Sequence, residues 1–484
     1  MSDTGRLHVG DCVEVLRTLP ARSVHCCVTS PPYWGLRDYG MERQVGLEES
    51  PEAYVDTLVR VFGEVRRVLR PDGVLWLNLG DSYAQERGHG YWEGKGRSKG
   101  DENQQRTTKR WASVGAEDIG LRAGSLMGLP WRVALALQAD GWVLRSDTVW
   151  AKRNMLPESV AGWRWERCRV KKGGKRSLAS KSAQGGGHRD KRHGNLEDQP
   201  AAEWEECPGC ARCAPNGGLV LRRGSWRPTR SHEYVFQLAK SPNYFGDGED
   251  VREPNQPDTP HRVVRGHHRP GHKWSDGPGD QTIANDLSQA HNPAGRNLRD
   301  VWFLPSQPSR LRHFAMMPPL LVDKCLRSSC PSHACAACGA PWARVVGRGS
   351  SIPDPTQRRT AHYNTADRYG VRNGGNGGFD ALAARMRAGT NGKVTRGFRP
   401  TCACGAGAVP GTVLDPFLGA GTVPGVAEYL GLRWEGIELN PEYARLLPDR
   451  VAEVRAYYER RAGRKQSLTP SAPDVEQLGL FGHP

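Results

Sequence analysis

The stretch Thr29-Ser30-Pro31-Pro32-Tyr33-Trp34 follows a short apolar run, Val24 to Val28, which predicts a buried parallel strand. Two consecutive prolines end such a strand sharply, because neither donates a ladder hydrogen bond and Pro32 keeps the preceding backbone extended. Open α/β sheets bind their ligands at this carboxyl edge. The corner brings together a hydroxyl, two carbonyls and an aromatic face, which favours a nucleobase site. A proline turn with a packing tyrosine explains these six residues equally well.

Periodic segments on both sides of this corner predict an α/β fold. Ser50 and Pro51 open a helix whose apolar residues keep helical spacing up to Pro71. Further helices are expected over 12–19 and 130–139, and the stretch 311–326 is amphipathic. Strands are expected over 74–79, 142–150, 233–238, 413–415 and 434–438, whereas 84–125 predicts a long loop or lid.

A second decisive stretch is Asp415-Pro416-Phe417-Leu418-Gly419-Ala420-Gly421-Thr422, between an apolar strand and a helix. Glycines there let the backbone approach a ligand and direct the helix N-terminus towards it. Glu438 ends the following strand, where an acid can accept both ribose hydroxyls of a nucleoside cofactor. Together these features predict a cofactor site.

Bulk composition indicates a polyanionic partner. The 484 residues carry a formal net charge of +16, and residues 161–230 hold 16 Lys and Arg against 7 Asp and Glu, a net +9. We expect no membrane association, since no apolar run approaches the length of a span and the N-terminus lacks a signal-peptide core. A cytoplasmic, reducing location follows, and the thirteen cysteines are then thiols or metal ligands.

The two stretches together resemble the DNA amino-methyltransferases that use S-adenosylmethionine. DPFLGAGT, from Asp415 to Thr422, looks like their cofactor motif, and TSPPYW looks like their catalytic motif. Their order, catalytic motif first, resembles the circularly permuted (beta-type) group. Related PPY motifs occur in RNA and protein methyltransferases, but those generally place the cofactor motif first. One departure is that Ala420 and Val423 replace the commoner Ser and Thr, which removes no backbone donor.

The resemblance implies a Rossmann-like class I methyltransferase sheet with inserts. The expected regions are a catalytic half (1–160), a basic cysteine-containing insert (161–230), a core strand (231–246), a candidate target-recognition region (247–298), a cofactor-closing segment (299–330), a zinc-ribbon-like insert (331–408), a cofactor-binding half (409–462) and a flexible tail (463–484). Arg299 to Trp302 and His313 to Ala315 resemble the segment that closes over the methionine end of the cofactor.

The resemblance also implies roles for individual residues. Ser30 and the Pro31 carbonyl would bind the target amine, with Pro32 shaping the corner and Tyr33 stacking on a flipped base. Asp11 is similar to the acid that contacts the cofactor adenine. The expected cofactor-binding set is Asp11, Asp415, Pro416, Phe417, Gly419, Gly421, Thr422, Glu438 and Asn440. A Ser at the first motif position leans towards N4 of cytosine, and an Asp towards N6 of adenine. Cys26 and Cys27 are interpreted as core thiols, since no covalent intermediate is needed.

Two groups of cysteines have spacings that suit structural zinc. Cys335-x2-Cys338 and Cys402-x-Cys404 supply four thiols, each pair followed by a glycine as in zinc knuckles. Cys207-x2-Cys210-x2-Cys213 is denser, and Cys168 would complete it. Unrelated thiols or an iron–sulfur site are the alternatives for this second group.

The basic insert alternates arginines with the tryptophans Trp163, Trp165 and Trp226, a mixture suited to phosphates and stacked bases. The candidate DNA-binding residues are Trp163, Arg164, Trp165, Arg167, Arg222, Arg223 and Arg227, and a solvated face with packing tryptophans is the plainer alternative. In the tail, Gln477 to Phe481 resembles the peptide by which bacterial proteins dock on the sliding clamp.

The resemblance therefore implies a cytoplasmic, bacterial or phage-encoded, site-specific DNA methyltransferase that acts on double-stranded DNA, with N4 of cytosine as the favoured target and a restriction endonuclease as the candidate partner. The alternatives are an N6-adenine DNA methyltransferase, a zinc-stabilised DNA-binding protein with an inactive core, and an RNA methyltransferase.

Overall fold

The computed structural model describes residues 4–84, 116–153, 164–171, 204–222, 226–254, 295–307, 316–348 and 393–467. The chain forms two compact units, the first made of Met1–Arg153 and His232–Pro484 and the second of Asn154–Ser231. The expected basic insert, 161–230, falls within the second unit. Among the described residues, no helix is both long and apolar enough to cross a membrane.

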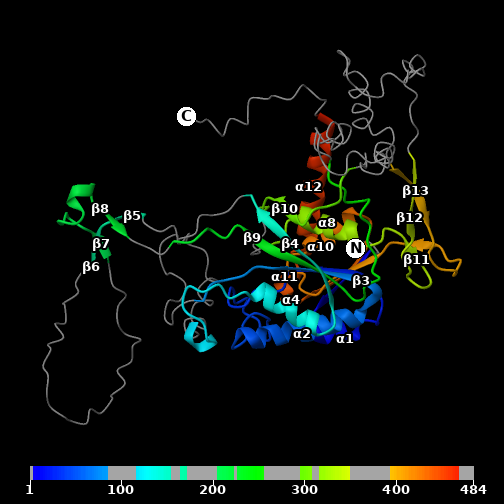
Figure 1. Cartoon of the computed structure of the whole chain (residues 1–484), viewed down its shortest axis with the longest axis horizontal. Coiled ribbons are helices and arrows are strands. Elements are labelled where there is room, and N and C mark those ends of the chain that lie inside the picture. The colour runs from blue at the N-terminus through cyan, green and yellow to red at the C-terminus, as the bar shows by residue number, and fades with distance from the viewer. Residues whose placement is uncertain are drawn as a thin grey trace, which may run out of the picture. The chain divides into compact units, whose positions relative to one another are not determined.

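An eight-stranded sheet organises the first unit (Figure 1). Its strand order is β1-β16-β15-β2-β3-β9-β4-β10, and all neighbours are parallel except β9, which is antiparallel to both β3 and β4. The strands are β1 (Gly5–Val9), β16 (Arg433–Glu438), β15 (Thr412–Asp415), β2 (Val24–Thr29), β3 (Leu69–Leu79), β9 (His232–Ala239), β4 (Val143–Lys152) and β10 (Val301–Leu304).

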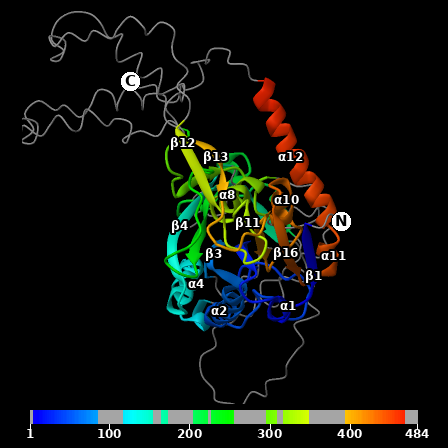
Figure 2. The same ribbon diagram turned by 90° about the vertical axis from the view of Figure 1, so that its right-hand side faces the viewer.

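Helices cover both faces of this sheet, so β2 is buried along its whole length. From Cys26 to Val28 the side chains of β2 alternate: Cys26 and Val28 pack on one face and Cys27 packs on the other. Val24, which precedes the register shift, packs on the same face as Cys27. One face is covered by α1 (Cys12–Thr18), α2 (Pro51–Val68) and α4 (Leu129–Ala139); the other by α8 (Pro319–Ser329), α10 (Thr422–Tyr429) and α12 (Leu447–Ser467). Figure 2 shows α12 alongside α10.

Smaller elements complete both units. Those of the first unit are the short helices α11 (Pro441–Ala444) and η2 (Ala116–Ile119) and the strand pairs β11 (Ala334–Cys335) with β14 (Ala408–Val409) and β12 (Ala343–Arg348) with β13 (Lys393–Arg399). Those of the second are the pairs β5 (Arg164–Arg167) with β8 (Leu219–Arg222) and β6 (Arg169–Lys171) with β7 (Trp204–Glu206), and the turn η4 (Ala214–Asn216).

The fold confirms the expected α/β class and corrects some boundaries. The second helix ends at Val68, and β3 begins at Leu69 rather than Val74, because the fully buried Leu69 pairs with Val24. A shift in register between Val24 and Cys26 accommodates Pro71-Asp72-Gly73 within the strand. Neither edge strand, β1 or β10, was predicted, and residues 85–115 of the expected loop lie outside the described part.

Candidate active site

A pocket of about 270 Å³ opens where β2, β15 and β16 reach their carboxyl ends. Two segments far apart in sequence meet there: the proline corner (Thr29–Trp34) after β2 and the glycine loop (Asp415–Thr422) after β15. They meet because β2 and β15 are hydrogen-bonded neighbours in the sheet. Ser30, Pro31, Pro32 and Tyr33 all line the pocket, as the sequence predicts.

The proline corner is fixed from behind by buried aromatic residues. Tyr54 of α2 is 1% exposed and donates its hydroxyl to the Pro32 carbonyl at 2.9 Å. Trp34 is buried and donates its indole N–H to the Glu48 carbonyl at 3.0 Å. On the other side, a Cβ added to Gly80 would lie 2.6 Å from Cε2 of Tyr33, so this glycine makes room for the ring. The corner is therefore a rigid platform.

Three polar residues that sequence reasoning missed join Ser30 and Tyr33 in a hydrogen-bond network. The Tyr33 hydroxyl donates to Glu233 Oε2 at 2.7 Å, and Lys152 pairs with Glu233 Oε1. Asn78 Nδ2 lies 2.9 Å from Glu233 Oε2, 3.0 Å from the Tyr33 hydroxyl and 3.3 Å from Ser30 Oγ, and its two N–H groups are shared among these three acceptors. Burial and the Glu233 carboxylate raise the pKa of Tyr33 well above its usual range, so the phenol stays protonated.

Asp415 connects the two segments. It is 2% exposed, and its Oδ1 accepts from Thr29 Oγ1 at 2.7 Å and from the Phe417 N–H at 3.1 Å. Burial raises the pKa of the Asp415 carboxyl to about 7, even though both hydrogen bonds lower it. These two hydrogen bonds fix the position of the proline corner relative to the glycine loop.

Glu438, at the end of β16, faces the same pocket. Its Oε2 accepts from the Gly419 N–H and its Oε1 from the Asn440 N–H, both at 2.8 Å. Burial raises the pKa of Glu438 to about 7, while these backbone donors lower it. Each oxygen retains acceptor capacity, which suits a pair of adjacent ribose hydroxyls.

The remaining residues of the predicted cofactor set surround these two acids. Asp11 caps α1 by accepting from the Val13 and Glu14 N–H groups at 2.9 and 3.0 Å, and it also lines the pocket. Gly421 caps α10 with φ +97, and a Cβ there would collide with Leu447. Gly421 is not among the residues that line the pocket, whereas Pro416, Phe417, Gly419, Thr422 and Asn440 are.

Only part of the segment expected to close over the cofactor, residues 299–330, lines the pocket. Val301 and Trp302 lie in β10 at the sheet edge, where Trp302 packs against Trp76. Ser306, Met316 and Met317 line the pocket instead. His313 to Ala315 lie outside the described residues.

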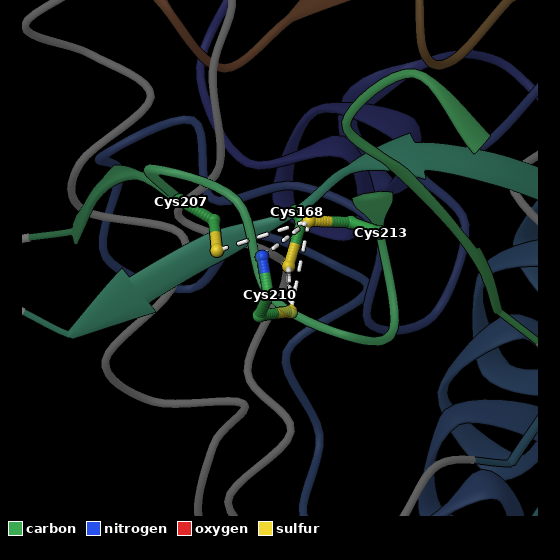
Figure 3. Close-up of side chains that lie close together, drawn as sticks. All are labelled: Cys168, Cys207, Cys210 and Cys213. Carbon is green, nitrogen blue, oxygen red and sulfur yellow. Dashed lines mark hydrogen bonds between the residues drawn. The ribbon is translucent and has the colours of Figure 1, made fainter. Parts of the chain in front are cut away.

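The first cysteine cluster lies in the second unit, where Cys168, Cys207, Cys210 and Cys213 converge (Figure 3). The sulfur–sulfur distances are 3.9 Å for Cys168–Cys210, 3.6 Å for Cys210–Cys213 and 3.8 Å for Cys213–Cys207. Backbone N–H groups of Arg212 and Cys213 lower the pKa of Cys210 to about 6. The structure therefore brings the four predicted cysteines together, and none of them forms a disulfide.

The second cysteine cluster, Cys335, Cys338, Cys402 and Cys404, has all four sulfurs within 4.8 Å of one another. It is anchored to the sheet of the first unit by His25 of β2. The His25 Nε2 hydrogen-bonds the Gly339 carbonyl at 2.9 Å, and its Nδ1 accepts from the Thr412 N–H at 3.0 Å. Burial lowers the pKa of His25 to about 4, so the ring is neutral and Nε2 carries the proton.

The predicted DNA-binding residues belong to the second unit, where the structure describes only some of them. Trp165 is 52% exposed on β5, and Trp226 is 74% exposed. Arg167 is exposed and pairs with Glu206, and Arg227 donates to the Pro228 carbonyl. The backbones of Arg164 and Arg222 are paired between β5 and β8. Trp163 and Arg223 lie outside the described residues, as do Gln477 to Phe481 and most of 247–298.

Comparisons with known proteins indicate the family of this chain. Residues 24–335 match a family model described as DNA methylase. The Type II methyltransferase M.XycI of Xanthomonas campestris pv. cyanopsidis is 29% identical over 92% of this chain and 87% of its own length. The Type II methyltransferase M.Cfr9I of Citrobacter freundii is 33% identical over 67% and 72%, respectively. Among solved structures, the cytosine-N4-specific PvuII DNA methyltransferase aligns over 95% of this chain and 93% of its own, with 13% identity and a TM-score of 0.41.

Proposed function

The chain belongs to the family of S-adenosylmethionine-dependent DNA amino-methyltransferases, and we propose that it methylates N4 of cytosine in double-stranded DNA. The observation that carries this proposal is the meeting of the proline corner and the glycine loop in one pocket, joined by the Thr29–Asp415 hydrogen bond. A base amine and a methyl donor can therefore come together there. Ser30 at the first motif position favours cytosine over adenine.

The pocket suits S-adenosylmethionine. Glu438 would offer carboxylate oxygens to the ribose hydroxyls, Asp415 when ionised would offer negative charge to the cationic methionine end, and Asp11, which also lines the pocket, would contact the adenine. When bound, the cofactor supplies a methyl group made electrophilic by its sulfonium. The glycine loop holds the backbone close enough for such a ligand to lie against it.

The target amine is a poor nucleophile because its lone pair is delocalised into the base ring. Ser30 Oγ and the Pro31 carbonyl can accept its two hydrogens and draw the nitrogen towards tetrahedral geometry, which frees the lone pair. Tyr33 provides an aromatic face for a base flipped out of the duplex, and stacking there offsets the few kcal/mol lost on unstacking. Positioning in a preorganised pocket supplies most of the remaining acceleration.

Nucleoside mass spectrometry of duplex DNA incubated with the protein and S-adenosylmethionine tests this proposal. We expect N4-methylcytosine. N6-methyladenine instead would overturn the choice of base, and unmodified DNA despite measurable cofactor binding would point to a DNA-binding protein with an inactive core. Offering RNA in parallel separates the two nucleic acids as substrates.

We also propose that both cysteine clusters hold structural zinc. A tetrahedral zinc with Zn–S bonds of about 2.3 Å keeps its sulfurs about 3.8 Å apart. The three sulfur–sulfur distances in the first cluster, 3.6–3.9 Å, already match that spacing. Structural zinc contributes about 10 kcal/mol or more to folding a small module, which explains how short strand pairs with few apolar residues keep their shape.

The second unit is proposed to contact DNA through its exposed tryptophans and arginines. Replacing Trp165 and Trp226 by alanine should weaken DNA binding and leave cofactor binding unchanged, as measured by two titrations on the same preparation. Unchanged DNA affinity would indicate that these side chains serve another purpose.

A further inference from the structure

The Glu233 carboxylate stands at the end of a hydrogen-bond chain that begins at Ser30. Ser30 Oγ lies 3.3 Å from the Tyr33 hydroxyl oxygen, which lies 2.7 Å from Glu233 Oε2. Glu233 comes from β9, the antiparallel strand inserted between β3 and β4. Its side chain is 13% exposed and lines the pocket without belonging to either sequence motif.

The hydrogen positions in this chain follow from its last member. A carboxylate can only accept, so the Tyr33 hydroxyl must donate to Glu233. The Tyr33 oxygen is then an acceptor, and it receives Asn78 Nδ2 at 3.0 Å together with the Ser30 hydroxyl. The Ser30 hydroxyl thus donates to Tyr33, and one of the lone pairs on Ser30 Oγ remains for an incoming N–H.

Two further residues hold Glu233 in this orientation. Lys152 of β4 pairs with Oε1, the oxygen that Tyr33 does not use, and its ammonium lies over the Trp150 ring at 4.8 Å. Asn78 of β3 donates to Oε2 at 2.9 Å and is itself 2% exposed. The carboxylate is therefore clamped by groups from two neighbouring strands.

We propose that Glu233 is the positioning residue that sets Ser30 as a hydrogen-bond acceptor and receives the proton released by the reaction. The amine nitrogen uses its lone pair to bond the methyl carbon, the carbon–sulfur electron pair stays on sulfur, and the nitrogen then holds one proton too many. That proton passes to Ser30 as the Ser30 proton passes to Tyr33 and the Tyr33 proton to Glu233. Glu233 ends as a neutral carboxylic acid, and Ser30 and Tyr33 are regenerated.

This inference rests on the proposed methyl transfer. Its test compares Glu233→Gln, Tyr33→Phe and the double variant with the unmodified protein, using single-turnover methyl transfer to DNA and a separate S-adenosylmethionine titration. Glu435→Gln is a matched control, because Glu435 is also a partly buried strand glutamate in an ion pair, with His8, but does not line the pocket.

Glu233→Gln and Tyr33→Phe should each slow methyl transfer about 100-fold, typical of losing a positioned proton acceptor, with cofactor affinity within twofold. The double variant should be no slower than the slower single variant, since both substitutions break one chain. Glu435→Gln should transfer at the unmodified rate. A Glu233→Gln rate equal to that of the unmodified protein, or losses that multiply in the double variant, would overturn the inference. Failure of the unmodified protein to methylate DNA would instead refute the proposed function.

Discussion

Replacing Asp415 by asparagine should remove part of the pH dependence of the free energy of unfolding. The Asp415 carboxyl has a pKa of about 7 in the folded protein, against 3.8 when unperturbed. Between pH 3.8 and pH 7, the Asp415 carboxyl is therefore more often protonated in the folded chain than in the unfolded chain. The stability contributed by the protonated carboxyl is therefore complete below pH 3.8 and is lost as the pH rises through 7.

The magnitude follows from the two pKa values. Each tenfold difference in proton affinity is worth about 1.4 kcal/mol, so the whole effect is about 4 kcal/mol. Between pH 6 and pH 8 the folded carboxyl releases its proton while the unfolded one is already ionised, and the loss is about 1.4 kcal/mol. The side-chain amide of the Asp415→Asn variant cannot titrate, but its oxygen can still accept from Thr29 and Phe417.

Chemical denaturation of the cofactor-free protein at pH 6 and pH 8 measures this difference. The unmodified protein should lose about 1.4 kcal/mol more over this range than Asp415→Asn. Glu438 and His25 titrate in both proteins, so their effects largely cancel in the comparison. Equal pH dependence in the two proteins would refute the assignment of a raised pKa to Asp415.

Three further perturbations test the corner, the metal sites and their link to the sheet. Gly80→Ala would place a Cβ 2.6 Å from Tyr33 and should slow methyl transfer at least tenfold with cofactor affinity unchanged; the control Gly63→Ala in α2, with no neighbour within 4 Å, should leave the rate unaltered. Metal analysis should find two zinc ions per chain, and a purified protein without zinc would contradict the cysteine assignment. His25→Ala leaves the Gly339 carbonyl and the Thr412 N–H without their partner and should lower the free energy of unfolding by about 2–4 kcal/mol, whereas an unchanged denaturation midpoint would show that this link contributes nothing.

The sequence predicts those parts of the site that are contiguous along the chain. The proline corner and the glycine loop each combine a buried strand, a turn and a polar side chain within a few residues, and Glu438 follows at the end of the next strand. The cysteines could be grouped because metal ligands recur at short spacings. In each case local chemistry restricts the local backbone.

The residues that sequence reasoning missed reach the site only through the sheet. Asn78, Lys152 and Glu233 come from β3, β4 and β9, and their proximity depends on the antiparallel insertion of β9 between the other two strands. A signal existed for Asn78, because it interrupts the buried apolar run of β3. Lys152 and Glu233 carry no such signal, since a charged residue near a strand end is ordinary.

Tyr33→Ala provides the most direct test of the claim that the two segments form one methyl-transfer site. S-adenosylmethionine binding and methyl transfer to DNA should be measured on the same preparation of the variant and the unmodified protein. The geometry predicts that methyl transfer is abolished while cofactor binding stays nearly intact, because Tyr33 belongs to the proline corner and no member of the cofactor set does. Equal loss of binding and transfer, or transfer that persists, would contradict it.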